Sequence, residues 1–363
     1  MNFYRQLIIL FMVSSCAPFI TYASEKRQPD FDINGYAMLD YDQFDPAFLE
    51  DSYNESDEAE LRRLRIATKY KFSKNWESKI QLSYDDKKFD FKDVYLKYSG
   101  WNLATVTVGQ QKEPFGLEKL ISSRNLLMIE RSLSTEAFSP GRTPGISFSG
   151  DTQNWDWKLG YYIEDNEANA ITGRASWSPL KKEDTLLHLG FAFSKRNSNS
   201  TEYRINEKLE IHTSDSLLEG DTIIADSKSL TGFETLFMKN SFLLMTEWQR
   251  SEVVDIASQK FTYDGGYLQL GYLFGGTSRK YKNGVLKGLD ESNQNGNWEV
   301  ALRASELRLL EESKSAQTLS FGINYYWNKD IKFMFNYIKA SHYEDDFEQD
   351  SGKAISLRAQ YSF

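Results

Sequence analysis

The amino-acid sequence predicts an all-β protein, a sixteen-stranded antiparallel transmembrane β-barrel whose third external loop folds into the lumen. Three observations support this fold class. The chain is rich in aromatic residues with glycine spread along it, apolar and polar residues alternate in short segments, and the last segment ends in phenylalanine. Together these features are typical of proteins that cross a membrane with strands.

The composition fits one large antiparallel domain. A soluble chain of 363 residues would form roughly two or three domains, but no break in composition divides this one. Phe, Tyr and Trp make up 15% of the residues, with 21 Tyr against three His. Aromatic residues favour strands, and glycine between short apolar segments marks turns. A single domain over residues 24–363 is therefore expected.

Residues 1–23 have the features of a signal peptide that is cleaved during export. Arg5 is the only charge in this segment, residues 7–13 are apolar, and small residues precede a cleavage site after Ala23. A membrane-anchoring helix is disfavoured because the apolar run is well short of about 20 residues. A lipoprotein acylated at Cys16 is the other alternative, and the residues before Cys16 match that signal poorly.

The charge and cysteine content of the mature chain exclude several classes of function. The net charge of the whole chain is −9, and it becomes about −10 once Arg5 is removed. Such an acidic chain is not expected to bind nucleic acid. The single cysteine lies in the signal peptide, so no disulfide or thiol chemistry is expected. Neither a cofactor nor a metal ion is expected.

The C-terminal segment 353–363 alternates between two kinds of residue. From Ile355 the odd positions are Ile, Leu, Ala, Tyr and Phe, and the even positions are polar or small. Because a strand has a side-chain period of two, one face would be apolar and the other polar. This pattern is typical of a closing barrel strand with one face toward lipid and one toward water. The terminal Phe363 also resembles the signal that outer-membrane barrels present to their insertion machinery.

The same alternation recurs along the chain with charges on one face. In segment 61–73, Leu64 and Ile66 would face lipid, whereas Arg63 and Arg65 would face the lumen. Most segments also carry Trp or Tyr near an end of the apolar stripe, as aromatic girdles at the two membrane interfaces require. A soluble β-sandwich would alternate too, but export, the girdles and the terminal phenylalanine favour the barrel.

Counting these segments predicts sixteen strands and orients the barrel. The predicted strands are 31–42, 61–73, 76–85, 90–99, 102–112, 142–150, 154–164, 167–178, 185–196, 227–239, 240–251, 260–275, 295–311, 315–328, 330–342 and 352–363. Connectors after even-numbered strands are mostly short and are assigned to the periplasm. The long connectors 43–60, 113–141 and 197–226 follow odd-numbered strands and are assigned to the outside. Connector 276–294 departs from this rule, because it is long and follows an even-numbered strand.

A barrel of this size is expected to enclose water. Eight strands leave an interior filled by side chains, whereas sixteen enclose an aqueous channel, so a charged lumen predicts a diffusion pore. Selectivity then depends on the charges at the narrowest point. Connector 113–141 is the candidate to fold inward, and it contains Lys119, Arg124 and Arg131. For each of these cations, a solvated position on the surface is the alternative.

Several stretches resemble the signature stretches of the phosphate-selective porin O and P family. They are residues 60–65, 91–98, 108–118, 122–124 and 129–132, with Gly109-Gln110-x-Lys112-x-x-Phe115-Gly116 the most specific run. Residues 297–300, 324–328 and 357–360 are similar to the family's late strands. The resemblance covers essentially residues 30–363.

The resemblance implies a homotrimer of outer-membrane barrels, surrounded by lipid and lipopolysaccharide, that passes phosphate or other small anions along basic side chains. The residues it implies for a basic ladder are Arg62, Arg63 and Arg65, and those for the constriction are Lys112, Arg124 and Arg131 with Asp93 beside them. Alternation alone, without the family, puts Arg142, Arg174, Arg303 and Arg358 in the lumen. Arginine suits this role because its planar fork binds two phosphate oxygens and stays charged.

Acidic residues are concentrated in residues 45–60, at the mouth of the predicted pore. They would repel a divalent anion unless they lie outside, where salt screens charges beyond about 8 Å. A general or cation-preferring porin on the same scaffold is therefore the first alternative. A barrel enzyme would need a histidine beside a carboxylate or serine, and His188, His212 and His342 are isolated in the sequence. An adhesion barrel would use connector 197–226, for which a mobile polar loop is the simpler interpretation.

Overall fold

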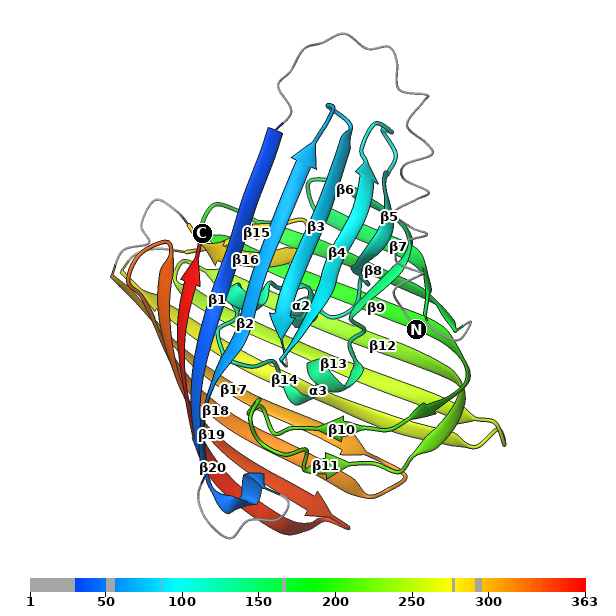
Figure 1. Ribbon diagram of the computed structural model, residues 1–363, viewed down its shortest axis with the longest axis vertical. Coiled ribbons are helices and arrows are strands. Elements are labelled where there is room, and N and C mark those ends of the chain that lie inside the picture. Colours follow the sequence, from blue (N-terminus) through cyan, green and yellow to red (C-terminus); the bar gives the residue numbers. More distant parts are fainter. Residues whose placement is uncertain (1–29, 50–55, 86, 165–167, 276–277, 291–295) are drawn as a thin grey trace.

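The structure, a computed structural model, describes residues 30–49, 56–85, 87–164, 168–275, 278–290 and 296–363. The predicted signal peptide lies outside the described residues. Sixteen antiparallel strands form one closed barrel, and two small two-stranded sheets accompany it (Figure 1). The predicted strand number and the closed antiparallel topology are confirmed.

The strands of the barrel follow one another around the wall in chain order. They are β1 (Asp30–Phe44), β2 (Ser56–Lys71), β3 (Trp76–Asp85), β4 (Lys88–Tyr98), β5 (Thr105–Lys112), β6 (Arg142–Asp151), β7 (Trp155–Ile163), β8 (Asn169–Lys181), β9 (Thr185–Tyr203), β12 (Ile223–Lys239), β13 (Phe242–Asp255), β14 (Lys260–Phe274), β17 (Asn297–Leu309), β18 (Lys314–Tyr326), β19 (Ile331–Glu344) and β20 (Phe347–Ser362). The smaller elements are β10 (Asn206–Glu207), β11 (Leu218–Glu219), β15 (Arg279–Lys282), β16 (Val285–Leu289), the helices α2 (Leu117–Leu120) and α3 (Leu133–Phe138), and the 3-10 turns η2 (Pro46–Phe48) and η3 (Ser123–Asn125).

The first and last strands pair to close the barrel. Tyr36 of β1 lies opposite Ser362 of β20, and Phe44 lies opposite Ala354. The backbones of Gly35 and Phe363 exchange two hydrogen bonds with N–O distances of 2.9 and 3.0 Å. The terminal phenylalanine thus extends the ladder at the seam, and closure of this kind removes the open edges that a flat sheet would expose.

Apolar side chains cover the outside of the wall, and polar side chains cover the inside. Trp157, Phe321 and Tyr361 are 40%, 37% and 52% exposed, whereas Arg303 and Arg358 are 1% and 3% exposed. Apolar side chains spread over a whole outer wall are unfavourable in water but favourable in hydrocarbon. These are the faces that alternation predicts. Among the described residues, no helix is long and apolar enough to cross a membrane.

Three connectors lie inside the barrel rather than beyond its ends. We call residues 113–141 loop 3, residues 204–222 loop 5, and the β15–β16 sheet (residues 279–289) the inner hairpin. β9 and β12 both extend into the connector predicted as 197–226, which shortens it to loop 5. The connector predicted as 276–294 contains the inner hairpin, which alternation did not reveal because its strands are only four and five residues long.

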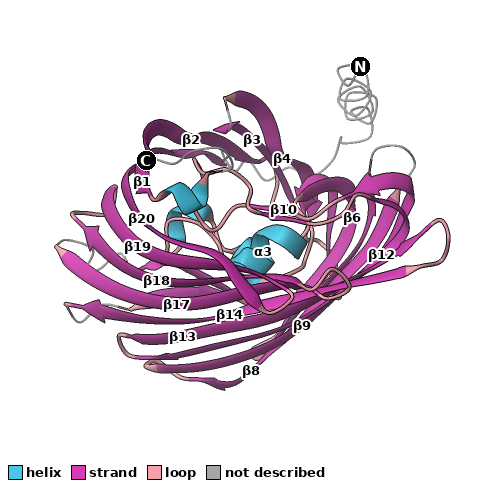
Figure 2. Cartoon of the chain, turned by 90° about the horizontal axis from the view of Figure 1, so that it is seen from below, coloured by secondary structure: helices cyan, strands magenta, loops and turns pink. Residues whose placement is uncertain are grey.

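Figure 2 shows α3 of loop 3 and β10 of loop 5 within the ring of strands. Phe115 of loop 3 and Ile211 of loop 5 belong to one buried apolar cluster, together with inward-facing apolar residues of the wall. Ile121 of loop 3 and Leu286 of the inner hairpin belong to a second cluster. Burial of apolar side chains from connectors explains why these segments fold inward, since each such side chain contributes about 1.5–3 kcal/mol when it leaves water.

The start of α2 is pinned to the wall by a carboxylate. Gly116 has a φ of 71°, in the left-handed region that favours glycine, and a Cβ there would lie 2.7 Å from the Ser139 hydroxyl oxygen. The turn at Gly116 lets the backbone N–H groups of Leu117 and Glu118 donate to Glu247 of β13 at 2.8 and 2.6 Å. Glu247 therefore satisfies donors that a helix leaves unpaired at its start.

Arg303 of β17 holds both inward loops. Its guanidinium lies 3.2 Å from the carboxylate of Glu118 in loop 3 and 2.5 Å from that of Glu210 in loop 5. It also donates to the backbone carbonyl of Glu130 at 3.0 Å. Arg303, Glu118 and Glu210 are all buried. This arginine therefore ties loop 3 and loop 5 to the same strand.

We predict that Arg303→Met destabilises the barrel, because it leaves Glu118 and Glu210 buried without a cation. Loss of one partner from a buried ion pair costs about 3–5 kcal/mol. The midpoint of urea unfolding in lipid vesicles, followed by tryptophan fluorescence, should fall. The control is Arg204→Met, since the Arg204–Glu219 pair is exposed and such pairs contribute about 0–1 kcal/mol. Equal midpoints for the two variants would contradict the anchoring role.

Candidate functional site

Along β2–β7 the lumen holds two cavities. The cavity nearer the long connectors, the loop-side cavity, has a volume of about 750 Å³ and is lined by β2–β6, loop 3 and loop 5. The cavity nearer the short turns, the turn-side cavity, has a volume of about 360 Å³ and is lined by β2–β7 and loop 3. Arg65, Lys112 and Arg142 line both cavities, so these side chains lie where the two meet.

A β-bulge turns adjacent arginines of β2 into the lumen. Met38 of β1 pairs with Arg63, but the next residue, Leu39, pairs with Leu61, which leaves Arg62 as an extra residue. A bulge interrupts the period of two. Arg62 and Arg63 are consequently both buried, at 5% and 7% exposure, whereas regular alternation would put one of them outside.

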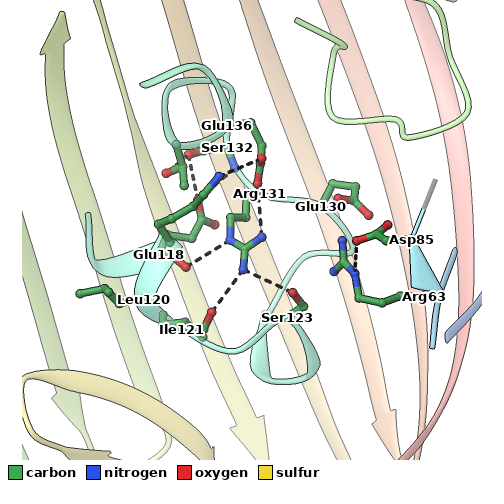
Figure 3. A network of polar contacts seen from close by, with 12 residues as sticks. Arg63, Asp85, Glu118, Leu120, Ile121, Ser123, Glu130, Arg131, Ser132 and Glu136 are labelled. Carbon is green, nitrogen blue, oxygen red and sulfur yellow. Dashed lines mark hydrogen bonds and ion pairs between the residues drawn. The ribbon is translucent and has the colours of Figure 1, made fainter. Parts of the chain in front are cut away.

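Arg62 and Arg63 already have carboxylate partners. Both form ion pairs with Asp85 of β3, and Arg62 also pairs with Glu130 of loop 3 at 3.0 Å. Figure 3 shows Arg63 bound to Asp85, with Glu130 beside them. Burial would raise the pKa of Glu130, but the guanidinium groups of Arg62 and Arg358 hold that pKa well below its usual value. Glu130 is therefore a permanent anion that joins loop 3 to β2 and β20.

Arg65 differs from the other two arginines of β2. Its Nε donates to the Ser83 hydroxyl at 3.3 Å, and its guanidinium lies 5.5 Å from the centre of the Tyr36 ring. Within the part of the chain that the structure describes, no carboxylate forms an ion pair with Arg65. Its charge is available to an anion in either cavity.

Asp93 of β4 lies at the junction of the cavities, where the sequence predicted an acidic neighbour. Its carboxylate accepts from Lys79 of β3 at 2.6 Å and from Arg142 of β6 at 2.5 Å. Arg142 also donates to Gln81 at 3.4 Å. Asp93 thus neutralises part of the cationic charge of this junction and fixes the position of the Arg142 side chain.

Lys112 lines both cavities and also caps the C-terminal end of α2. Its Nζ donates to the backbone carbonyls of Lys119, Leu120 and Ile121 at 2.5, 3.3 and 3.3 Å. These carbonyls end α2, and a cation at a helix C-terminus is favourable. Lys112 therefore shapes loop 3 as well as adding charge to the junction.

Arg131 serves mainly to fold loop 3. Its guanidinium donates to the carbonyls of Glu118 and Ile121 at 3.3 and 3.2 Å and to the Glu136 carboxylate at 3.3 Å (Figure 3). It lines the loop-side cavity, but most of its donors point into the loop. Arg124, the third residue predicted for the constriction, lines neither cavity, and its backbone carbonyl accepts from Gln360 at 3.3 Å.

Three lysines that the candidate set omitted line the turn-side cavity: Lys79, Lys97 and Lys158. Alternation had put all three in the lumen, but they carry no motif, so nothing in the sequence joined them to the site. Lys97 and Lys158 form no ion pair with described residues, and Lys158 donates to the Lys112 carbonyl at 3.2 Å. β4 and β7 are separated by two strands, and the pairing of β4 through β7 side by side puts these lysines around one cavity.

The charge balance of the two cavities differs. The turn-side cavity has six basic side chains (Arg65, Lys79, Lys97, Lys112, Arg142 and Lys158) and one carboxylate, Asp93. The loop-side cavity has nine basic side chains (Arg62, Arg63, Arg65, Lys92, Lys112, Lys119, Arg131, Arg142 and Lys208) and six carboxylates (Asp85, Asp90, Glu130, Glu136, Glu207 and Glu210). Basic groups therefore outnumber carboxylates in both cavities, and the excess is larger in the turn-side cavity. No cluster of His, Cys, Asp or Glu suited to a metal ion occurs among the described residues.

The fold and the lumen define a class of protein. A closed sixteen-stranded barrel with an apolar outside and water-accessible charged cavities inside is a porin of the outer membrane. The model of one family, the phosphate-selective porins O and P, matches residues 31–363. The chain belongs to that family.

Relatives and solved structures agree with this assignment. Porin O of Pseudomonas aeruginosa is 24% identical over 94% of this chain and 90% of its own length. The anion-selective porin from Comamonas acidovorans has a TM-score of 0.62 at 12% identity, covering 93% of this chain and all of that one (100%). OmpT of Vibrio cholerae, solved in a trimer form, has a TM-score of 0.62 at 11% identity with the same coverage, 93% and 100%. At such identities the structures support the fold alone.

We predict that anion current falls as the pH rises through about 8. Glu207 of loop 5 lines the loop-side cavity, and burial together with the nearby Glu136 raises its pKa to about 8, against the opposing effect of Lys119. A carboxyl with a raised pKa is neutral below pH 8 and becomes an anion above it, where it repels permeating anions. Chloride conductance of single channels in planar bilayers, recorded from pH 6.5 to 9.5, checks this expectation. Glu207→Gln should reduce the change, and an identical pH profile in this variant would refute the assignment.

Proposed function

We propose that this porin conducts small anions, phosphate among them, through the two cavities, with Arg65, Lys112 and Arg142 at the narrow point. The observation that supports this proposal most is the excess of basic side chains over carboxylates around the turn-side cavity. Loop 3 supports this proposal because it lies against the inner face of the wall and lines both cavities.

Arg65 is the residue best suited to hold the anion. At a narrow point an anion loses part of its water, and fixed donors must replace the lost hydrogen bonds. Arg65 has donors that no described carboxylate occupies, and it lines both cavities. An anion could pass from Arg65 to Lys97 and Lys158, which lie along the same route toward the short turns.

Asp93 supports release. An anion that bound too tightly would block the pore, since conduction needs binding strong enough to enter and weak enough to leave. By occupying Lys79 and Arg142, Asp93 reduces the number of free donors at the junction. The family resemblance implied an acid beside the constriction at Asp93, without a role.

A general or cation-preferring porin is the second candidate, and a specific observation favours it. The mature chain is acidic, and carboxylates line the loop-side cavity, which a solute from outside would enter first. The two candidates differ in the sign of the reversal potential in a salt gradient, so one bilayer recording separates them.

Assembly and export complete the proposal. We propose a homotrimer, by analogy with the solved OmpT of Vibrio cholerae in its trimer form, and cleavage of the signal peptide after Ala23. A broad apolar outer wall favours lateral association in a membrane. Migration of the unheated detergent-solubilised protein as a monomer on a native gel would argue against the trimer.

We predict that Arg65→Gln lowers the chloride-over-potassium permeability ratio about fivefold, the factor that about 1 kcal/mol produces. The reversal potential in a tenfold-graded KCl bilayer experiment measures this ratio. Arg124→Gln is the matched control, because it removes the same charge from a residue that lines neither cavity. Equal shifts in the two variants, or none for Arg65→Gln, would exclude the proposed narrow point.

We predict the opposite effect on binding for Asp93→Asn. This change frees Lys79 and Arg142 and should tighten phosphate block of the chloride current by about tenfold, because hydrogen bonds to charged groups contribute about 1.5–3 kcal/mol. Phosphate titration of the chloride current gives the half-blocking concentration. Asp30→Asn is the control, since Asp30 is exposed, pairs with Lys71 and lines neither cavity. Weaker block in Asp93→Asn would mean that Asp93 organises the site rather than opposing the anion.

A further inference from the structure

Loop 5 brings a carboxyl group without a partner to the loop-side cavity. Glu207 lines this cavity, and the charged groups that act most on it are Glu136 and Lys119. Lys119 is already bound to Glu136, with 3.1 Å between its Nζ and the carboxylate oxygen. Arg131 binds the same carboxylate at 3.3 Å (Figure 3). Glu136 therefore takes both cations, and Glu207 has no ion pair of its own among the described residues.

The other charged groups around Glu207 are engaged elsewhere. Lys208, the next residue in the chain, donates through its Nζ to the backbone carbonyl of His212. In the β10–β11 sheet, Glu219 is exposed and forms an ion pair with Arg204. Neither neighbour supplies Glu207 with a counter-charge.

Glu210, three residues further along loop 5, adds a second acid to the same cavity. Its Oε2 pairs with Arg303 and accepts from the Ser320 hydroxyl at 3.1 Å. Its Oε1 has no hydrogen-bond partner within the described part of the chain. Arg303 also pairs with Glu118, so two carboxylates share one guanidinium. A positive charge in the cavity would stabilise the acids of loop 5.

The wall of the same cavity supplies a cation without a carboxylate. Arg65 of β2 lines the cavity and is only 7% exposed. Its printed neighbours, the Ser83 hydroxyl and the Tyr36 ring, are neutral. One volume of about 750 Å³ thus contains an unpaired guanidinium on the β2 wall and an unpaired carboxyl group on loop 5.

A plain anion satisfies only one side of this cavity. Phosphate would be attracted by Arg65, but Glu207 and Glu210 would repel it. A molecule that carries an ammonium group beside its phosphate would satisfy both sides. Hydrogen bonds from an ammonium to a carboxylate, and from a guanidinium to phosphate, are roughly twice as strong as those between neutral groups.

We propose that the loop-side cavity binds small phosphate esters or phosphonates that also carry an ammonium group. The phosphate or phosphonate oxygens accept from the Arg65 guanidinium, the ammonium donates to Glu207, and Glu210 adds negative charge beside it. The inference rests on the proposed function, because the anionic end of the ligand uses the Arg65 of the anion route. It names a substrate class for that route.

The ionisation of Glu207 gives this site a characteristic pH dependence. Burial and then the charge of Glu136 raise the pKa of Glu207 to about 8, against the opposing effect of Lys119. Glu207 is therefore mostly neutral at pH 6.5 and an anion at pH 9, whereas an alkylammonium group stays charged up to about pH 10. A ligand with an ammonium group should bind more tightly as the pH rises through 8, over the range in which chloride conductance falls.

The experiment compares block of the chloride current of the full mature protein by 2-aminoethylphosphonate and by ethylphosphonate, which lacks only the amine. The readout is the ratio of the two half-blocking concentrations in planar bilayers, since ionisation of the phosphonate group affects both compounds. At pH 9 we expect 2-aminoethylphosphonate to block at about tenfold lower concentration, and we expect this preference to shrink at pH 6.5. At a site that recognises only negative charge, the added amine would weaken the block instead.

Variants separate the two ends of the ligand. Glu207→Gln should bring the ratio at pH 9 close to one, and Arg65→Gln should weaken block by both compounds. Glu219→Gln is the matched control, because it makes the same change at an exposed residue of loop 5 that does not line the cavity. The pH dependence of the ratio in the wild-type protein tests the same assignment without any substitution.

The outcomes distinguish this inference from the proposed function. Equal block by the two compounds in the wild-type protein at pH 9, or weaker block by 2-aminoethylphosphonate, would overturn the ammonium site and leave the anion route standing. An equal loss of preference in Glu207→Gln and Glu219→Gln would also overturn it. Absence of block by either compound would contradict the proposed function, and the inference with it.

Discussion

The lumen of this barrel takes its shape from carboxylates of the inward loops that are buried against arginines of the wall. Glu118 pairs with Arg303, and Glu130 pairs with Arg62 and Arg358. A buried charge without a partner is strongly unfavourable, so each carboxylate holds its loop wherever the wall supplies a cation. Loop 3 can occupy the lumen only because inward-facing arginines from β2, β17 and β20 converge on it. The volume that these contacts leave open along β2–β7 is the route available to a solute.

The same pairs divide the basic residues into two groups. Arginines that contact loop carboxylates hold the architecture, and their charge is already balanced. Arg65, Lys97 and Lys158 have no such partners among the described residues, and they line the junction and the turn-side cavity. An acidic protein can therefore contain a locally basic passage, because an anion responds to charges within a few ångströms and salt screens those beyond about 8 Å. The net charge of the chain is a poor guide to its selectivity.

The outer wall is built by the same alternation of side chains that lines the lumen. Period-two alternation that sends charge into the lumen sends apolar side chains toward lipid, and the rows of β13–β19 show where the apolar band ends. Beyond that level Arg250, Asp264 and Arg308 form a polar row on the outer wall. Charged residues near a membrane interface cost about 0–1 kcal/mol, far less than at the midplane. The rim can thus hold polar groups without destabilising the barrel.

The number of strands and the face of most side chains were determined by the sequence alone, because both follow from local periodicity. Arg65, Asp93, Arg303 and Arg358 face inward as alternation predicted, and the closing strand ends at the seam. Only the tertiary structure decided the rest. The bulge that turns Arg62 inward depends on the register of β1 against β2, and Lys158 lines the same cavity as Lys97 because β4 through β7 pair side by side. The burial of the inner hairpin and the set of side chains that lines each cavity depend on packing between segments far apart in the chain. Such contacts leave no periodic trace in the sequence, since they are set by which side chains meet across the lumen.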